Sequence, residues 1–414
     1  MKVCIHRGSN EIGGSCIEIE SQGKRIILDI GLPLDSDYAD VPLPLISGFI
    51  NSDDSLLGVL ISHPHLDHYG LASKISTDVT FMIGISARRI LEIADLFLPH
   101  GVTFKNTIDL KNRSPIHLGP FTLTPFLMDH SAYDAYSVLV EAGGKRLFYS
   151  GDFRAHGRKG KLFDQLISNH PQDIDVLLME GTTIGRSDSE ISYPSEDNLE
   201  KEFVELMFNC KGMVLVWCSG QNIDRLVTVF RACLKTERQF IVDMYTASIL
   251  RATHNPKVPQ AEWDRVKVYL PKTQKRSIIK KKLFDLSNSF KSSRIFPEQL
   301  AGVASKSVML FRPSIISELE EAKCLDQAEL IYSLWPGYLE DNRYEWLKNR
   351  FKKLNIPVTH CHTSGHSSVE DLKRLTNALK PKMLVPVHTL ERGRFQDLFE
   401  NVVIREDGQI WEVM

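Results

Sequence analysis

The sequence lacks the features of a secreted, membrane-spanning or disordered chain. It contains seven cysteines without a Cys-x-x-Cys pair, and no apolar run approaches the roughly 18 residues that a membrane-spanning helix needs. Low-complexity tracts and internal repeats are missing, and residues 1–6 form no apolar leader with a cleavage site. Scattered cysteines of this kind are typical of reduced, buried thiols. We therefore expect a cytoplasmic protein that does not enter a membrane.

An overall excess of positive charge is also missing. The 50 basic and 52 acidic side chains leave a formal net charge of −2, whereas a dedicated duplex-binding protein is usually basic. Cations nevertheless gather in two places, which are Lys272, Lys275, Arg276, Lys280, Lys281 and Lys282, and then Arg154, Arg158, Lys159 and Lys161. The first group favours a solvated surface, because charged runs usually are one. The second group adjoins a candidate metal ligand, so contact with phosphates and simple solvation fit it equally well.

Potential metal ligands are dense directly after the apolar run 56–62. His63, His65, Asp67 and His68 fall within six residues. Imidazole and carboxylate ligands in such a loop suit a borderline-soft divalent cation such as zinc, and this mixture is more typical of hydrolytic sites than of thiolate-rich structural ones. The alternative is a polar surface loop that happens to be rich in histidine. Its position at the end of a predicted buried strand argues against that alternative.

Other histidine and aspartate residues end further apolar runs. His130 follows residues 121–127, Asp152 follows 145–151, and His388 follows 383–387. A single histidine after a strand is usually an ordinary loop or core residue. Together with the cluster at 63–68, however, four strands deliver ligands to their ends, where catalytic groups tend to gather. The sequence therefore predicts one shared metal centre.

These motifs resemble those of the metallo-β-lactamase superfamily. The resemblance rests on His63-x-His65-x-Asp67-His68, His130, Asp152 in Ser-Gly-Asp, and Asp29 in Leu-Asp-Ile-Gly, and it covers roughly the first 180 residues. Glu180 in Met-Glu-Gly-Thr-Thr, His366 in Ser-Gly-His and His388 in Pro-Val-His resemble the β-CASP nuclease branch and extend the match over almost the whole chain. Within that branch, the ribonuclease J and cleavage-and-polyadenylation endonuclease groups are the most similar.

The resemblance implies a centre of two zinc ions. The first ion would be held by His63, His65 and His130, the second by Asp67, His68 and His388, with Asp152 bridging both. Asp29 would support the histidine loop from behind. Histidine and aspartate ligands also accept manganese.

The resemblance further implies hydrolysis of RNA phosphodiester bonds. A hydroxide generated by the two ions would attack phosphorus. His366, tuned by a hydrogen bond to Glu180, would protonate the leaving oxygen, and Asp67 would belong to the same catalytic group. RNA is favoured over DNA because family members that act on DNA tend to carry valine where this chain has His388. Cleavage inside the strand and cleavage from the 5′ end both remain open.

Several residues are candidates for contact with the substrate. Ser219 and the pair Ser364–Gly365 each lie where a strand gives way to a helix, so backbone N–H groups there could hold a phosphate, as the resemblance to ribonuclease J also implies. Arg312, after the apolar run 307–311, could assist. The expected partner is single-stranded RNA. A dimer of the ribonuclease J type is not expected, because its C-terminal dimerisation domain is missing; another homodimer or a recruiting protein cannot be determined from the sequence.

The pattern of strands and helices predicts an α/β protein with an inserted domain. From residue 199, strand, loop and helix alternate as in a parallel sheet. The segment 186–198, rich in Ser, Asp and Glu, is a predicted crossing between domains. By resemblance, an αββα sandwich formed by 1–193 and 354–414 is expected to enclose a β-CASP insert at 194–353. The run 402–413 predicts a final hairpin around Asp407–Gly408.

Two alternative functions are weighed against a ribonuclease. A small-molecule hydrolase of the superfamily, such as a thioesterase or lactonase, would lack the insert and the full set of Glu180, His366 and His388. A non-catalytic RNA-binding scaffold would be expected to have lost ligands, and here none is lost.

Overall fold

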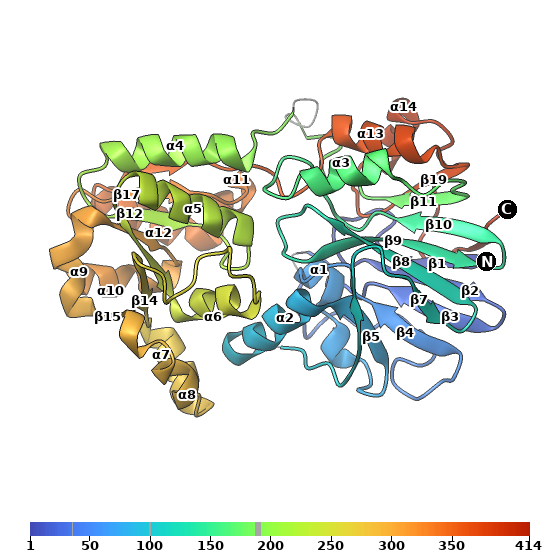
Figure 1. Ribbon diagram of the computed structural model, residues 1–414, viewed down its shortest axis with the longest axis horizontal. Coiled ribbons are helices and arrows are strands. Elements are labelled where there is room, and N and C mark those ends of the chain that lie inside the picture. Colours follow the sequence, from blue (N-terminus) through green and yellow to red (C-terminus); the bar gives the residue numbers. More distant parts are fainter. Residues whose placement is uncertain (35, 99–100, 187–191) are drawn as a thin grey trace. The chain divides into compact units, whose positions relative to one another are not determined.

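The computed structural model describes residues 1–34, 36–98, 101–186 and 192–414 (Figure 1). The chain divides into two compact units. Unit 1 comprises Met1–Asp95, Pro99–Tyr193 and Gly365–Met414, and unit 2 comprises Leu96–Leu98 and Pro194–Ser364. Residues 187–191, inside the predicted crossing, lie outside the described residues. The chain thus leaves unit 1, builds unit 2, and returns to complete unit 1.

Unit 1 contains two sheets among the described residues. The first has the strand order β20-β1-β2-β3-β4-β5-β6, with β20, β1, β2 and β3 antiparallel and β3 to β6 parallel. Its strands are β1 (Lys2–Arg7), β2 (Cys16–Ser21), β3 (Lys24–Leu28), β4 (Leu56–Leu60), β5 (Thr80–Gly84), β6 (Asn106–Leu110) and β20 (Ile410–Glu412).

The second sheet of unit 1 has the order β19-β11-β10-β9-β8-β7. The strands β10, β11 and β19 run parallel, whereas β7 to β10 are antiparallel. Its strands are β7 (Ile116–Leu118), β8 (Phe121–Met128), β9 (Ala135–Ala142), β10 (Lys145–Tyr149), β11 (Val176–Met179) and β19 (Met383–Pro386).

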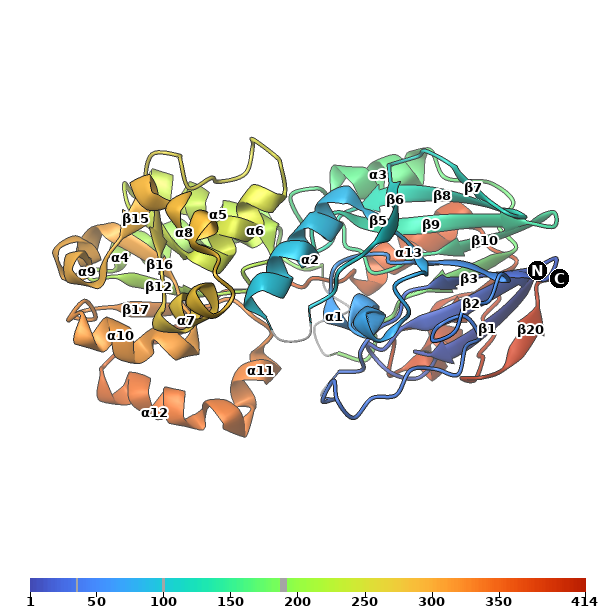
Figure 2. The ribbon, with the colours of Figure 1, turned by 90° about the horizontal axis from the view of Figure 1, so that it is seen from below.

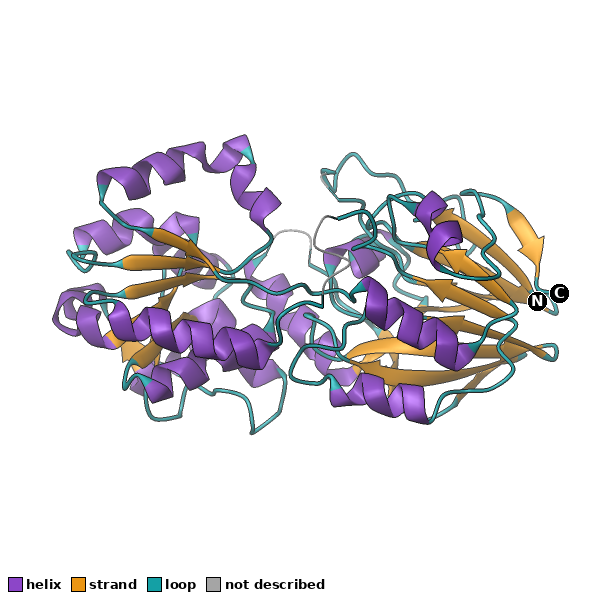
Figure 3. Ribbon diagram, turned by 90° about the horizontal axis from the view of Figure 1, so that it is seen from above, coloured by secondary structure: helices purple, strands orange, loops and turns teal. Residues whose placement is uncertain are grey.

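The two sheets of unit 1 pack face to face and helices cover their outer faces. In β2, Ile17 and Ile19 point to the same side as the strand alternates, and they join Val138 and Leu178 of the second sheet in one core. Separate clusters lie on the outer faces, where α2 (Ile85–Phe97) covers the first sheet and α3 (Lys161–Ser168), α13 (Val369–Leu379) and α14 (Phe395–Leu398) cover the second. Figure 3 shows these layers. The predicted αββα sandwich is confirmed.

Unit 2 is built on one parallel sheet, as its alternating pattern predicted. The order is β15-β14-β13-β16-β12-β17-β18 in the described residues, from β12 (Val214–Trp217), β13 (Gln239–Asp243), β14 (Val266–Tyr269), β15 (Arg294–Ile295), β16 (Ser307–Leu310), β17 (Glu329–Tyr332) and β18 (Val358–His360). Helices flank the sheet on both faces (Figure 2), namely α4 (Glu196–Asn209), α5 (Ile223–Lys235), α6 (Met244–Ala252), α7 (Lys272–Lys280), α8 (Phe284–Asn288), α9 (Pro297–Val303), α10 (Ile316–Glu321), α11 (Pro336–Glu340) and α12 (Glu345–Lys353).

The predicted hairpin at 402–413 is wrong. Within that segment only β20 is a strand, and it pairs antiparallel with β1, where Cys4 lies opposite Ile410. Gly408, at a φ of 78°, turns the chain so that its N–H donates to the carbonyl of Ile5 over 2.7 Å. The edge of β1 offers unpaired backbone groups that satisfy the final strand better than a local hairpin partner. The C-terminal strand therefore closes the sheet that begins at the N-terminus.

No helix in the described part of the chain combines the length and the apolarity that crossing a bilayer requires.

Candidate metal centre

Loops at strand ends of unit 1 bring the predicted ligands together. The loop after β4 carries His63 and His65 into the short helix α1 (Leu66–Tyr69), which carries the next ligands of the motif. His130 follows β8, Asp152 follows β10, and His388 follows β19. Both sheets thus send side chains to one place, as the strand-end pattern predicted.

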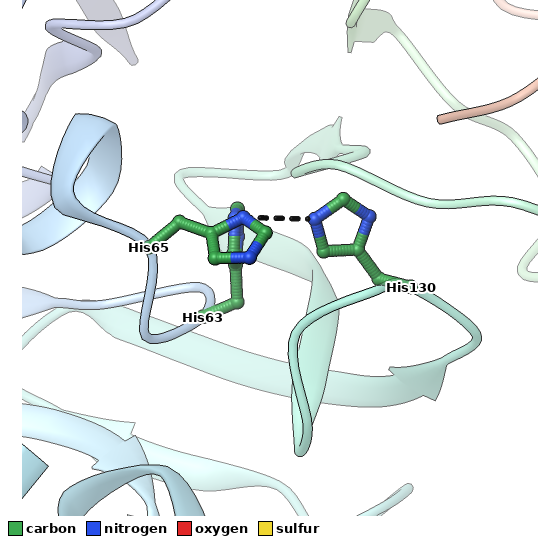
Figure 4. Close-up of side chains that lie close together, drawn as sticks. All are labelled: His63, His65 and His130. Carbon is green, nitrogen blue, oxygen red and sulfur yellow. Dashed lines mark hydrogen bonds between the residues drawn. The ribbon is translucent and has the colours of Figure 1, made fainter. Parts of the chain in front are cut away.

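Three histidines form the first ligand group. Nδ1 of His65 lies 3.2 Å from Nε2 of His63 and 3.2 Å from Nε2 of His130, and the rings face one another in Figure 4. One nitrogen from each can be chosen so that all lie within 4.8 Å, which suits a single ion. Burial lowers the pKa of His65 to about 4 and holds the pKa values of His63 and His130 well below the usual value. All three are therefore neutral near pH 7, the form that binds a metal.

Two aspartates and two histidines form the second ligand group. Asp67, His68, Asp152 and His388 offer ligand atoms within 4.8 Å of one another. Nε2 of His388 lies 3.3 Å from Oδ2 of Asp67, and Nε2 of His68 lies 3.2 Å from Oδ2 of Asp152. Asp152 also approaches the first group, since its Oδ2 is 3.7 Å from Nε2 of His63. Its carboxylate therefore lies between the two groups.

The buried polar atoms of this centre fit divalent cations. Both carboxylate oxygens of Asp152, Nε2 of His68 and Nδ1 of His130 are buried without a hydrogen-bond partner in the described residues. Burial alone would raise the pKa of Asp152, but the facing His388 and His68 hold it well below its usual range, so the carboxylate is ionised. Charged and polar groups buried in this way are costly unless they are paired or bind an ion. The donor set thus matches a two-metal site.

Asp29 holds the second ligand group from behind. It is buried at a φ of 60°, and Oδ2 accepts hydrogen bonds from Nδ1 of His68 over 2.8 Å and from the hydroxyl of Tyr149 over 2.6 Å. The N–H of Ser62 donates to Oδ1 over 2.7 Å. Burial opposes a positive charge on His68, but Asp152 and Asp29 together raise its pKa well above the usual value. A metal would replace the proton on Nε2.

His388 has a partner that the sequence analysis missed. The hydroxyl of Thr182 lies 2.9 Å from Nδ1 of His388, which leaves Nε2 directed toward Asp67. The backbone of His388 has a φ of 51°, and its N–H donates to the carbonyl of Gly8 over 2.7 Å. Such partners fix the orientation of a ligating imidazole. The only signal in the sequence was the threonine two residues after Glu180, which looks like an ordinary loop residue.

Glu180 and His366 form a hydrogen-bonded pair beside the ligands. Oε2 of Glu180 lies 2.9 Å from Nδ1 of His366, and Oε1 accepts the N–H of Phe153 over 2.8 Å. Nδ1 of His366 is 3.6 Å from Oδ2 of Asp152. Although burial alone would lower the pKa of His366, Glu180 and then Asp152 raise it. The side chain of His366 is 20% exposed, whereas that of Glu180 is 2% exposed, so the imidazole is the member of the pair that reaches solvent.

The four candidate substrate contacts are divided between the units. Gly365 lies in unit 1, where an added Cβ would come within 2.5 Å of the Ser131 hydroxyl next to His130, so a larger residue would force the Ser131 side chain to move. Ser364 is the last residue of unit 2, which also contains Ser219 and Arg312. Arg312 donates to the carbonyl of Cys218 over 3.0 Å and to Asp243 over 3.0 Å. It therefore supports the loop that carries Ser219.

The second group of cations, which comprises Arg154, Arg158, Lys159 and Lys161, does not form one exposed patch. Arg154 is fully buried and forms an ion pair with Asp129 over 3.5 Å. Its backbone N–H also donates to the carbonyl of Asp129 over 2.7 Å. Arg154 is therefore part of the support for the His130 loop and is not available to phosphates. Sequence proximity to Asp152 was misleading, because the side chain turns into the protein.

Comparisons with known proteins find two matching family models and several relatives. A beta-lactamase superfamily domain matches residues 49–206, and a Zn-dependent metallo-hydrolase RNA specificity domain matches residues 353–413. Ribonuclease J of Helicobacter pylori is 22% identical over an alignment that covers 94% of this chain and 56% of that protein. Ribonuclease J 1 of Streptococcus pyogenes is 22% identical, with coverages of 97% and 72%. The chain thus spans little more than half the length of the first of these relatives.

A solved structure has the same fold along its whole length. A protein of unknown function from Enterococcus faecalis V583 matches with a TM-score of 0.79 and 20% identity, covering 99% of both chains. At this identity, the likeness concerns the fold alone. The resemblance to β-CASP proteins of the metallo-β-lactamase superfamily is confirmed by the family matches and the ribonuclease J relatives together.

Proposed function

We propose that this member of the metallo-β-lactamase superfamily is a metal-dependent ribonuclease that hydrolyses RNA phosphodiester bonds. The single observation that carries the proposal is the position of Asp152. Its carboxylate lies between two complete ligand groups and 3.6 Å from His366, whose partner is Glu180. Ligands for two ions beside a general acid are the parts that two-metal hydrolysis of a phosphodiester uses.

The ligand groups divide naturally between two ions, which we infer to be zinc. His63, His65 and His130 would hold one ion, while Asp67, His68 and His388 would hold the other, and Asp152 would contact both. When bound, such a pair lowers the pKa of a water and offsets the charge of the phosphate oxygens. Manganese is also compatible with these ligands.

His366 acts in this proposal as the general acid. Its Nδ1 is engaged by Glu180, so Nε2 is the nitrogen that can deliver a proton. The carboxylates of Glu180 and Asp152 raise the pKa of His366 against the opposing effect of burial, and so favour the charged imidazolium. Transfer of that proton to the leaving oxygen would prevent a charged alkoxide from accumulating as the bond to phosphorus breaks. Asp67, hydrogen-bonded by His388, belongs to the same catalytic group.

The choice of RNA is supported by the relatives and by one family match. The relatives are named ribonuclease J, and the matched RNA specificity domain contains His366 and His388. In a single strand, backbone N–H groups at Ser364–Gly365 would hold the phosphate of a neighbouring nucleotide. In unit 2, the Ser219 loop, supported by Arg312, is a separate candidate for contact with a phosphate. All seven cysteines are buried and free, which supports a reducing compartment such as the cytoplasm.

The test uses one 5′-monophosphorylated RNA labelled at its 3′ end, and a DNA of the same sequence. The metal-loaded parent, an Asp152→Ala variant and an Asp164→Ala control are compared on a denaturing gel over time. Asp164 is an exposed residue of α3, so its removal leaves the centre intact. We expect the parent and the Asp164→Ala control to cut the RNA, and the Asp152→Ala variant to leave it intact. Internal fragments would identify an endonuclease and progressive shortening a 5′ exonuclease, whereas RNA left intact by the parent would reject the proposal.

A further inference from the structure

The helix α7 of unit 2 carries a basic surface. Lys275, Arg276 and Lys280 are exposed and share one face with Lys272, at spacings of three, four and eight residues. Ile278, which is 3% exposed, anchors the opposite face. In Figure 1 the helices α7 and α8 extend from the sheet of unit 2. The spacing therefore creates a stripe of cations about 12 Å long, from a rise of about 1.5 Å per residue.

Most charges of this stripe have no ionic partner in the described residues. Lys272 is the exception, because its Nζ lies 2.6 Å from Glu321. Lys275, Arg276, Lys280 and Lys282 face solvent without an ion pair. Four like charges on a short segment repel one another. The contacts that hold α7 to unit 2 come from other residues, namely Ile278, Gln274, which accepts the N–H of Tyr245 over 3.0 Å, and Lys272, whose N–H donates to Glu318 over 3.1 Å.

Two large apolar side chains that neighbour these cations in the sequence are also exposed. Ile279 is 54% exposed and Phe284, at the start of α8, is 52% exposed. Proteins bind single-stranded nucleic acids with aromatic rings and cationic side chains together, because bases stack on the rings while the cations neutralise phosphates. An anionic membrane would instead favour a wide apolar face, and the exposed side of α7 has only Ile279.

We propose that α7 and the start of α8 form a docking surface for single-stranded RNA, formed by Lys275, Arg276, Lys280, Lys282 and Phe284. This inference rests on the proposed function, because RNA is the substrate there. The surface acts without base-specific contacts, so it would retain a strand of any sequence. It raises the affinity for long RNA and leaves the chemistry to unit 1.

The experiment replaces four cations together, as Lys275→Gln, Arg276→Gln, Lys280→Gln and Lys282→Gln. A control removes the same charge from scattered exposed positions of unit 2, as Lys201→Gln, Lys211→Gln, Lys257→Gln and Lys306→Gln. Both sets are made in the full chain with Asp152→Ala, so that a fluorescent 20-nucleotide RNA stays intact during anisotropy titrations at several salt concentrations. We expect a loss of affinity on the order of tenfold for the α7 set and a salt slope smaller by about 2 to 3. The control should lose less than about threefold.

A second measurement uses the metal-loaded protein without the Asp152 change. The α7 set should raise KM for the 20-nucleotide RNA more than KM for a trinucleotide. Equal affinities and slopes for the α7 set and the control would overturn the docking surface, while cleavage by the parent would still support the proposed function. RNA that is bound through α7 but never cut by the parent would support the docking surface and reject the proposed function. If the α7 set lost binding to phosphatidylserine vesicles but kept its affinity for RNA, the inference would be overturned in favour of a lipid surface.

Discussion

The two units bury charge in opposite ways. In unit 2, the guanidinium of Arg225 is fully buried, and each of its nitrogens donates hydrogen bonds, including 3.1 Å to Glu196, 3.2 Å to the carbonyl of Ser333 and 3.5 Å to that of Thr363. In unit 1, the carboxylate of Asp152 is equally buried, yet neither oxygen has a hydrogen-bond partner among the described residues.

This difference separates a structural charge from a functional one. Arg225 joins the start of α4, the end of β17 and the segment before Ser364, so its bonds are already complete. Asp152 faces histidines that are themselves short of partners, so its bonds await an ion. Unsatisfied buried groups cost free energy, and their concentration in one place is a better indicator of a site than burial or charge alone.

The largest expected effect concerns the acid beside the ligands. His366→Ala should lower the rate of RNA cleavage by about 10² to 10⁴, the range typical of a lost general acid. Because His366 is outside the two proposed ligand groups, metal content should remain that of the parent. Elemental analysis and single-turnover kinetics check both parts, and added imidazole should restore some rate. Loss of metal in this variant would show that His366 is a ligand and would refute the assignment.

The paired charge in unit 2 should respond to loss of its partner by unfolding. Glu196→Ala leaves the guanidinium of Arg225 buried without its carboxylate, which should cost about 3–5 kcal/mol of unfolding free energy. Four of the five tryptophans lie in unit 2, so urea unfolding followed by tryptophan fluorescence measures this unit. Glu205→Ala, an exposed change on the same helix, is the control. Equal stability of Glu196→Ala and Glu205→Ala would show that the carboxylate of Glu196 does not stabilise the buried guanidinium of Arg225.

Removal of metal should destabilise unit 1 and spare unit 2. An ion at 100 times its Kd stabilises the folded state by about 2.7 kcal/mol, which corresponds to roughly 5–10 °C in Tm for a domain of this size. A chelator should therefore lower the transition reported by Trp411 in unit 1. The transition of unit 2 should not move. A uniform shift of both transitions would contradict an ion held by unit 1 alone.

A smaller effect is expected where a hydroxyl orients a ligand. Thr182→Val keeps the shape of the side chain but removes the hydrogen bond to Nδ1 of His388. We expect metal affinity to fall about 10–100-fold, as for other residues that orient ligands. Thr182→Ser keeps the hydroxyl and should stay close to the parent in competition titrations with a zinc indicator. If valine and serine bind metal equally well, Thr182 does not orient the imidazole.

The smallest effect tests a paired charge within unit 1 itself. Asp175 is buried, and its carboxylate accepts one hydrogen bond from Nζ of Lys382 over 2.8 Å and another from the backbone N–H of Arg146 over 2.8 Å. Burial would raise its pKa, but Lys382 and the Arg146 N–H lower it. Asp175→Asn should cost about 1 kcal/mol of unfolding free energy at pH 7. The folded pKa of Asp175 lies below the unfolded value of about 3.9. The difference in unfolding free energy between the parent and Asp175→Asn should therefore shrink as the pH falls from about 5 toward 3. Urea titrations of the metal-free protein measure it. A pH-independent difference would refute the pairing.

The gathering of the candidate ligands in one place could be predicted from the sequence, because most of them follow apolar strands closely. The pairing of Glu180 with His366 came from family resemblance, since the two are 186 residues apart. Ser62, Tyr149 and Thr182 were missed, because a hydroxyl in a strand or loop carries no sign of the partner it will meet. The domain boundaries and the roles of individual site residues remain predictions.

Long-range partners explain the other failures. Arg225 and Glu196 are 29 residues apart on different helices, so no local pattern marks them as a pair. The final strand was assigned to a hairpin because a turn and an alternating run are local signals, whereas its real partner is β1 at the other end of the chain. The burial of Arg154 also contradicts both alternatives left open for its group of cations, which were contact with phosphates and solvation.

The return of the chain to unit 1 has a consequence for biosynthesis. His366 and His388 lie in the segment that is translated after unit 2, and β19 and β20 join sheets whose other strands precede that unit. A nascent chain that ends within unit 2 therefore carries four ligand histidines and both ligand aspartates, but neither His366 nor His388. The full ligand set therefore exists only after the ribosome has translated the chain past unit 2.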